Sequence, residues 1–514
     1  MLKDLDPRRQ LELAIQHHQS GRLNEAERLY LELLRQDPAN FTAGHFLGVI
    51  RYQQGQFADA INLIGAALRL NPGSIGALSN YGLALKAGGR LGEALSSYDR
   101  ALALKPGNPD IHNNRGAVLE EMGRTAEALA DYDRAIALNR NHADAWNNRG
   151  NLLSARARFD EALAAYDAAL AANPHFALAW NNRGNALFAL GRSEEALSAY
   201  DRALVLEPDF VEAHHNRFQP LLERMQLDEA LKTCDRAIAL RPGQASAHNS
   251  RAIVLQRMGR FAEALAGYDA ALAIFPDQKV RNNRASLQLL MKRFQEAGET
   301  FAQAHENAPD DDQAFSGLAA AALNLCDWPL AARLAPEIKS RLEQGRAAID
   351  PLMLMGYSDD PGLMRRASEN YQRDRVPVIP APLASRKVMS GGRIRIAYLS
   401  ADFHTHPTAS LMAGLFERHD RGRFEIRAVS FGPDDFSPMR SRLKAAFEHF
   451  HDVRSLSDRD VARLLADSNI DIAINLNGHT QGGRPGILAF RPAPIQVSYL
   501  GFPGTSGAPC MDYL

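Results

Sequence analysis

Two loops near the C-terminal end of the sequence carry side chains that can transfer protons or form hydrogen bonds with a ligand. The first loop, SADFHTHPT (400–408), places Asp402 and His406 four residues apart after a run of strand-forming residues. Carboxylate and imidazole groups can both take a proton from an attacking hydroxyl, because their pKa values can be tuned toward neutral pH. A simpler explanation is that Asp402 caps the next helix and the histidines are polar loop residues. Taken alone, this loop favours the simpler explanation.

The second loop, NGHTQGG (477–483), also follows a predicted strand and contains His479 and Thr480. These two residues are candidates for the edge of the same site, with the same two explanations. A glycine-rich run, GFPGTSG (501–507), predicts a tight, structured loop. Glycine content alone is weak support for phosphate binding.

Strands and helices alternate around these loops. The predicted strands are 393–400, 424–432, 451–453, 471–478 and 494–501, with helices at 408–419, 438–449 and 459–468. This alternation predicts an α/β fold with a doubly wound parallel sheet. Such sheets bind ligands beyond the carboxyl ends of their strands, where both loops lie. The free N–H groups at the start of helix 408–419 suit a sugar hydroxyl or a phosphate.

The first 309 residues repeat with a period of 34. Proline, glycine, alanine and tyrosine each recur on a 34-residue grid; the tyrosine grid contains Tyr30, Tyr98, Tyr132, Tyr166, Tyr200 and Tyr268. Each unit has apolar residues at helical spacing on both sides of a break, which predicts two helices, the second ended by proline. One pair cannot bury its apolar face alone, so neighbouring pairs must stack into a right-handed solenoid.

This period and composition are typical of tetratricopeptide repeats, an α-solenoid. We predict about eight repeats over residues 5–276 and a shifted ninth, so that the superhelix covers 5–309. Residues 310–375 stay helical without the period, and 376–392, rich in Pro, Ser and Gly, predict a linker. Residues 393–514 form the α/β region.

One position in the first helix of most units is asparagine: Asn80, Asn114, Asn148, Asn182, Asn216 and, after a one-residue shift, Asn283. Asparagine is less favourable than alanine inside a helix, so its repetition points to a role. A carboxamide donates and accepts, so a row of them can bind the main chain of an extended peptide. Alternatively, each asparagine bonds to the adjacent repeat or caps a turn. The arginine row that starts at Arg115 could favour acidic clients or be a solvated face.

Composition fits a globular protein of several domains. The chain has 514 residues, 46% of them hydrophobic and 23% charged. Lys plus Arg (59) nearly equals Asp plus Glu (60), which gives no attraction to nucleic acid or membrane. The three cysteines lie far apart and the N-terminal segment lacks an apolar signal core, so we expect a cytoplasmic protein.

The repeats followed by IAYLSADFHTHPTASLM, NLNGHTQGGRPGILAFRPAPIQ and LGFPGTSGAPCMDYL resemble the O-linked N-acetylglucosamine transferase family, which includes the Spindly-type O-fucosyltransferases. The resemblance covers nearly the whole chain. It implies a two-lobed GT-B (Rossmann-like) glycosyltransferase that transfers a sugar to Ser or Thr with inversion. The implied donor is UDP-GlcNAc, and the implied partners are protein or peptide acceptors along the repeats. No metal or other cofactor is expected.

The resemblance also implies roles for individual residues. Asp402 matches a loop aspartate of a proton relay, and His406 matches a histidine at the junction of donor and acceptor. Pro407 and Thr408 match positions that line the sugar pocket, and the asparagine row matches a peptide-holding ladder. The animal enzymes have a further active-site histidine upstream, but the similar stretch here, MGYSDDPGLMRR (355–366), has none. The general base therefore stays open.

Most contacts to the uridine nucleotide lie, by the same resemblance, in a second lobe. We expect residues 393–514 to be an incomplete first lobe and residues 1–514 to have little or no transferase activity. Two alternatives stay open: an O-fucosyltransferase that uses GDP-fucose, and a non-catalytic repeat scaffold that only binds proteins.

Overall fold

The computed structural model describes residues 6–376, 381–383, 392–480, 482–500 and 507–513. The chain divides into two compact units, residues 1–216 and 217–514, and each is described by itself. Most of the predicted linker 376–392 and of the glycine-rich run 501–507 lies outside the described residues.

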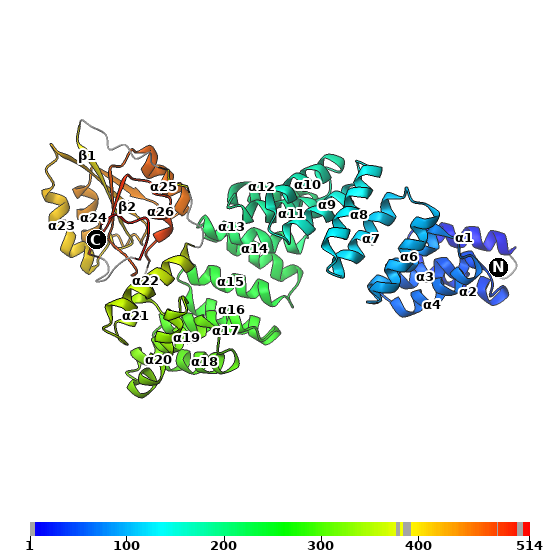
Figure 1. Cartoon of the computed structure of the whole chain (residues 1–514), viewed down its shortest axis with the longest axis horizontal. Coiled ribbons are helices and arrows are strands. Elements are labelled where there is room, and N and C mark those ends of the chain that lie inside the picture. Colours follow the sequence, from blue (N-terminus) through cyan, green and yellow to red (C-terminus); the bar gives the residue numbers. More distant parts are fainter. Residues whose placement is uncertain (1–5, 377–380, 384–391, 481, 501–506, 514) are drawn as a thin grey trace. The chain divides into compact units, whose positions relative to one another are not determined.

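The first unit is a series of helix pairs, coloured from blue to green in Figure 1. These helices are α1 (Pro7–Gln19), α2 (Leu23–Gln36), α3 (Phe41–Gln53), α4 (Phe57–Leu70), α5 (Ile75–Ala87), α6 (Leu91–Leu104), α7 (Pro109–Glu121), α8 (Thr125–Leu138), α9 (Ala143–Ser154), α10 (Phe159–Ala172), α11 (Ala177–Ala189) and α12 (Ser193–Leu206). Helix α13 (Val211–Glu223) spans the boundary between the units. The predicted two-helix repeats are confirmed.

The turn inside each helix pair needs one residue with positive φ. Gly55, Gly89, Gly123 and Gly191 supply it at φ values of 71–76°. Ala157 takes the same place at φ 57°, where its Cβ makes the left-handed conformation costly. The glycine grid of the sequence therefore marks these turns.

A glycine of the first helix packs against the buried tyrosine ring of the second helix in several repeats. The pairs are Gly82–Tyr98, Gly116–Tyr132, Gly150–Tyr166 and Gly184–Tyr200. A Cβ atom at any of these glycines would lie 2.5–2.8 Å from the ring, closer than real Cβ atoms approach. The rings are almost fully buried and have no room to move away. Close helix approach therefore depends on glycine here.

The second unit continues the helix pairs and then changes character. Its helices before the sheet are α14 (Leu227–Leu240), α15 (Ala245–Arg257), α16 (Phe261–Ile274), α17 (Gln278–Leu290), α18 (Phe294–Asn307), α19 (Asp312–Asn324), α20 (Trp328–Glu343), α21 (Pro351–Leu354) and α22 (Pro361–Arg375). Pairs of equal length run to α18, and α19–α22 differ in length.

The C-terminal part of this unit is a parallel sheet with the strand order β3-β2-β1-β4-β5. The strands are β1 (Ile394–Ser400), β2 (Phe424–Ser430), β3 (His449–Asp452), β4 (Ile472–Asn475) and β5 (Ile495–Ser498). The helices between them are α23 (Pro407–Arg418), α24 (Pro438–Ala446), α25 (Asp458–Asp467) and α26 (Pro485–Ala489). The predicted doubly wound sheet is confirmed, and α26 is an addition too short to show a helical period.

Helices cover both faces of the sheet, so successive residues of β1 pack in two different cores. Tyr398 packs in one core with Phe416 of α23 and Leu443 of α24. Leu399 packs in the other with Val461 of α25 and residues of α26. The register places Ser400 beside Ser430, and Ser430 beside Asp452. Strands β1, β2 and β3 therefore end at the same edge, and so do the loops that follow them.

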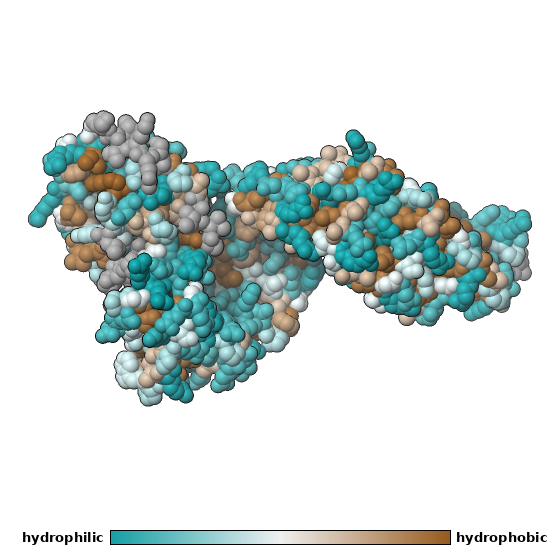
Figure 2. All heavy atoms as spheres, in the orientation of Figure 1, coloured by the Kyte–Doolittle hydropathy of each residue, from teal (hydrophilic) through white to brown (hydrophobic). Residues whose placement is uncertain are grey.

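Hydrophobic residues on the visible surface of the repeats are interspersed with hydrophilic ones (Figure 2). Within the described ranges, no helix has the length and apolar character needed to cross a membrane.

Two glycines of α5 allow the Gly–Tyr packing to be tested. Gly82→Ala should destabilise the first unit by about 1–3 kcal/mol, because the added methyl overpacks the Tyr98 ring. Gly76→Ala, in the same helix but with open space around its Cβ, should stabilise it by roughly 0.5–1 kcal/mol. Urea unfolding measures the free energy of unfolding of each variant. Hydrogen exchange of the amides in α5 and α6 shows where the change occurs. Equal effects of the two substitutions would contradict the packing argument.

Candidate active site

The loop after β1 is fixed to the loop after β4 by one buried asparagine. Asn477 has no exposed surface. Its Oδ1 accepts the Ala401 N–H at 2.8 Å, and its Nδ2 donates to Oδ2 of Asp402 at 2.8 Å. The side chain of Asp402 is 12% exposed, so the carboxylate lies at the floor of the loop with one oxygen held. Sequence reasoning missed Asn477, although its position directly after a strand is the signal that could have found it.

His406 is the N-cap of α23, and not Asp402 as the simpler explanation of the loop assumed. Its Nδ1 accepts the Thr408 N–H at 3.2 Å. The same Nδ1 lies 3.7 Å from Oδ2 of Asp402, so the structure brings the two predicted catalytic residues together. A nitrogen that accepts an N–H carries no proton, which assigns the neutral ring the tautomer with the proton on Nε2. In this state Nε2 is a hydrogen-bond donor.

The sugar-pocket candidates are the first two residues of α23. Pro407 at this position leaves no N–H unsatisfied, and the Thr408 N–H is used by the cap. Both residues lie next to His406, at the edge where strands β1 and β2 end.

The two site-edge candidates face different surroundings. Thr480 donates through Oγ1 to the Asn477 main-chain oxygen at 2.7 Å, and it therefore belongs to the group around Asp402. His479 is buried and its ring meets the Tyr371 ring edge-on at 5.4 Å between centroids. Tyr371, on α22, also lines a cavity of about 470 Å³ together with Ser316, Asp350 and Asp374. His479 therefore packs against α22, one of the helices that precede the sheet.

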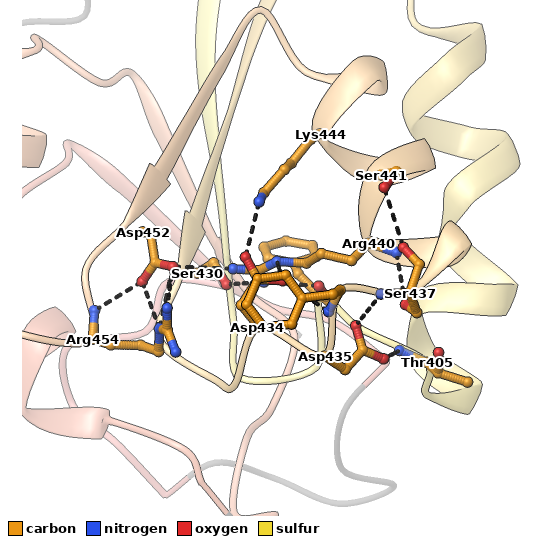
Figure 3. Close-up of polar contacts among 12 residues, drawn as sticks. Thr405, Ser430, Asp434, Asp435, Ser437, Arg440, Ser441, Lys444, Asp452 and Arg454 are labelled. Carbon is orange, nitrogen blue, oxygen red and sulfur yellow. Dashed lines mark hydrogen bonds and ion pairs between the residues drawn. The ribbon is translucent and has the colours of Figure 1, made fainter.

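Close backbone approach holds the loops after β1 and β2 together. A Cβ atom at Gly432 would lie 1.6 Å from the Ala401 carbonyl oxygen, so only glycine fits there. Two further contacts to the β1 loop come from Asp435 in the loop after β2 and from Arg440 in the first turn of α24, drawn in Figure 3. Neither residue stood out in the sequence, because each lies about 30 or more residues from its partner.

The asparagine row forms hydrogen bonds between repeats. Four of its members donate to an asparagine of the preceding repeat: Asn148 to Asn113, Asn182 to Asn147, Asn216 to Asn181 and Asn283 to Asn249, at 2.9–3.3 Å. Asn80 lies 3.0 Å from the Nε2 of His45, and Asn114 is half-buried at the same register. The geometry thus supports the inter-repeat explanation for these amides, while peptide binding by the row stays a prediction.

The arginine row is paired with aspartates of neighbouring helices. The pairs are Arg115 with Asp99 and Asp131, Arg149 with Asp133, Arg183 with Asp167, Arg251 with Asp235, and Arg284 with Asp269. The N···O distances are 2.6–2.7 Å. Because the charges are compensated inside the protein, this row offers little attraction to acidic clients.

Comparison with known protein families agrees with this architecture. Residues 374–514 match the family described as Glycosyl transferase family 41. Segments between residues 11 and 312 match tetratricopeptide repeat families. The repeat region is thus followed by a glycosyltransferase family 41 domain over residues 374–514. The relatives that the chain matches are named as O-GlcNAc transferase and SPINDLY proteins.

Several curated relatives show what the chain is similar to. It is 35% identical over 205 residues to the probable UDP-N-acetylglucosamine–peptide N-acetylglucosaminyltransferase SEC of Arabidopsis thaliana, covering 37% of this chain and 21% of the relative. It is 43% identical over 141 residues to the UDP-N-acetylglucosamine–peptide N-acetylglucosaminyltransferase of Caenorhabditis elegans, covering 27% of this chain and 12% of the relative. The matched segments are thus a small part of each relative.

A solved structure, a mutant O-GlcNAc transferase of Thermobaculum terrenum, is 24% identical to this chain. The likeness covers 66% of this chain and 52% of that one, with a TM-score of 0.29, which is too low to support an inference.

The bridge formed by Asn477 can be tested by a nearly isosteric change. Asn477→Asp replaces the donor to Asp402 by a carboxylate, which leaves two facing carboxylates in a buried position. We expect the α/β region to lose about 1–3 kcal/mol of stability, measured by hydrogen exchange of the β1 and β4 amides. Asn469→Asp, at an exposed turn, is the matched control and should change little. Equal protection in the parent protein, in Asn477→Asp and in Asn469→Asp would show that Asn477 does not hold the loop.

Proposed function

We propose that this chain is the acceptor-side part of a protein O-glycosyltransferase that moves N-acetylglucosamine from UDP-GlcNAc to Ser or Thr hydroxyls. The observation that carries the proposal is the 3.7 Å approach of Asp402 and His406 at the ligand-binding edge of a family 41 sheet. The names of the relatives support the donor and the peptide acceptor.

At the anomeric carbon, the reaction forms one bond and breaks one. The acceptor oxygen bonds to the anomeric carbon of the sugar while the bond from that carbon to the β-phosphate oxygen breaks, and UDP leaves with the electron pair. The hydroxyl proton must go to a base or a relay. Oδ2 of Asp402 is held by Asn477, and no described residue donates a hydrogen bond to Oδ1. Oδ1 can therefore enter a proton relay that begins at the acceptor hydroxyl.

His406 suits the role of donor better than that of base. Its Nδ1 is occupied by the Thr408 N–H, and its Nε2 carries the proton in the neutral ring. Nε2–H can bond to an oxygen of the sugar or of the departing phosphate. The start of α23 adds the partial positive charge of a helix N-terminus on the same side.

Protein acceptors are proposed to reach this edge from the repeats. The half-buried asparagine row offers carbonyl oxygens to an extended main chain even where its amides bond to the preceding repeat. The cavity beside Tyr371 has polar lining residues suited to a peptide segment. We place the reaction in the cytoplasm, since Cys234, Cys326 and Cys510 are all free thiols.

A transfer assay tests the chemistry. In a version of the protein that carries both lobes, labelled UDP-GlcNAc should transfer sugar to a Ser-containing peptide, and labelled GDP-fucose should not. Asp402→Asn should lower kcat by about 10²–10⁴-fold, because proton transfer contributes that much. His406→Ala should lower it by a similar factor through loss of the donor.

Asp420→Asn is the control for Asp402→Asn, because Asp420 is an exposed carboxylate that precedes β2 at the opposite edge of the sheet. Transfer from GDP-fucose but not from UDP-GlcNAc would show that the donor is GDP-fucose. No transfer from either donor, with peptide binding retained, would favour the scaffold alternative.

Residues 1–514 alone should show little or no transfer from UDP-GlcNAc. The described residues of the α/β region form one sheet, whereas a GT-B site takes donor contacts from two lobes. Scintillation counting of a labelled peptide after incubation measures this. Substantial transfer by the purified 514 residues would show that the donor site is complete within them.

A further inference from the structure

The loop that carries Asp402 and His406 is held from the side by the segment between β2 and α24 and by the first turn of α24 (Figure 3). Two hydrogen bonds join them. Nη1 of Arg440 donates to the Phe403 carbonyl at 2.8 Å, and the Thr405 N–H donates to Oδ2 of Asp435 at 2.9 Å. Each bond lies within one residue of a predicted catalytic side chain.

Arg440 is the buried part of this arrangement, with a side chain that is only 1% exposed. Its Nη1 also donates to the Ser430 hydroxyl at 2.6 Å, and its Nη2 lies 3.2 Å from Asp452. The guanidinium lies over the Phe450 ring, 4.8 Å from its centroid. Asp434, 3.6 Å from Nε, supplies a second negative charge. Arg440 therefore ties the ends of β2 and β3 to the loop after β1.

Asp435 is the exposed part. One carboxylate oxygen accepts the Thr405 N–H, and the other accepts the Ser437 N–H at 3.1 Å. The Thr405 N–H is the main cause that holds the pKa of Asp435 well below its usual range. The carboxylate is thus ionised, and an acceptor for both amides, throughout the neutral range.

The bond to Thr405 is not needed to begin α24. Ser437 already caps that helix, with its hydroxyl accepting the Arg440 N–H at 3.1 Å. The neighbouring Phe436 is 89% exposed at φ 52°, an unfavourable conformation for an aromatic residue. A strained, exposed turn persists only where its surroundings fix it, and strain of this kind collects at functional sites.

We propose that Asp435 and Arg440 form a clamp that positions Asp402 and His406 for sugar transfer. Asn477 holds the loop from the β4 side, and the clamp holds it from the β2 side. Asp435 and Arg440 are positioning residues: they act on the main chain at Phe403 and Thr405 and leave the reacting groups to Asp402 and His406. This inference rests on the proposed function, but its structural part can be measured without any activity.

Hydrogen exchange of the 514-residue chain tests the clamp directly. Asp435→Ala should speed exchange of the amides in 403–408 by about tenfold or more, because the Thr405 N–H loses its acceptor. The thermal midpoint should move by less than about 2 °C, since Asp435 is exposed. Asp435→Asn keeps one oxygen acceptor and should restore part of the protection.

Asp420→Ala is the matched control. Asp420 is also exposed and accepts a main-chain N–H, that of Gly422 at 2.9 Å, at the other edge of the sheet. Asp420→Ala should speed hydrogen exchange only in the turn that contains residue 420. Unchanged exchange of 403–408 in Asp435→Ala would overturn the clamp, and so would loosening of the same extent in Asp420→Ala.

The kinetic consequence is a fall in kcat in the version with both lobes. Asp435→Ala should lower kcat about tenfold or more with little change in the KM for UDP-GlcNAc, because misplacement of the loop affects the transition state more than donor binding. Asp435→Asn should recover part of the kcat that Asp435→Ala loses. A rise in that KM with kcat unchanged would overturn the positioning role. An inactive parent protein would instead contradict the proposed function, while the exchange data would still decide the clamp.

Discussion

The site depends on a loop that hydrogen bonds from neighbouring segments hold in place. Residues 401–406 connect a strand to a helix and form no regular structure, so neighbouring loops must fix them. Asn477 binds this loop from the β4 side, and Arg440 and Asp435 bind it from the β2 side. This is possible because parallel strands end at one edge, where the loops after β2, β1 and β4 lie side by side. In the loop held in this way, the Asp402 carboxylate lies 3.7 Å from the His406 imidazole.

In the repeats, close packing of the helices positions the side chains of the asparagine row. Glycine against tyrosine brings the two helices of a repeat together, and the repeat of 34 residues then places asparagines of successive repeats within hydrogen-bond distance. Each of these bonds uses one of the two Nδ2 protons of the donating asparagine. The arginines beside them are likewise paired with aspartates. The row is therefore ordered by the repeat's own contacts, and under the proposed function its remaining amide protons and carbonyl oxygens face the peptide.

Periodicity made most of the fold predictable. Spacing of 34 located the helix pairs, and alternation of strands and helices located the sheet, because both patterns are local in sequence. Asp402 and His406 were predictable as neighbours for the same reason. Asn477 and Arg440 were not, since their partners lie 37–76 residues away and no local pattern encodes that distance. The different surroundings of His479 and Thr480 also depend on packing, because adjacent loop residues point in directions that no period fixes.

We propose that a peptide hydroxyl receives a sugar at this edge of the sheet. A crystal structure of a version with both lobes, bound to UDP and a Ser-containing peptide, measures this most directly. We expect the serine oxygen beside Asp402 and the donor phosphates within reach of Nε2 of His406. A peptide bound elsewhere, with Asp402 and His406 remote from both ligands, would contradict it.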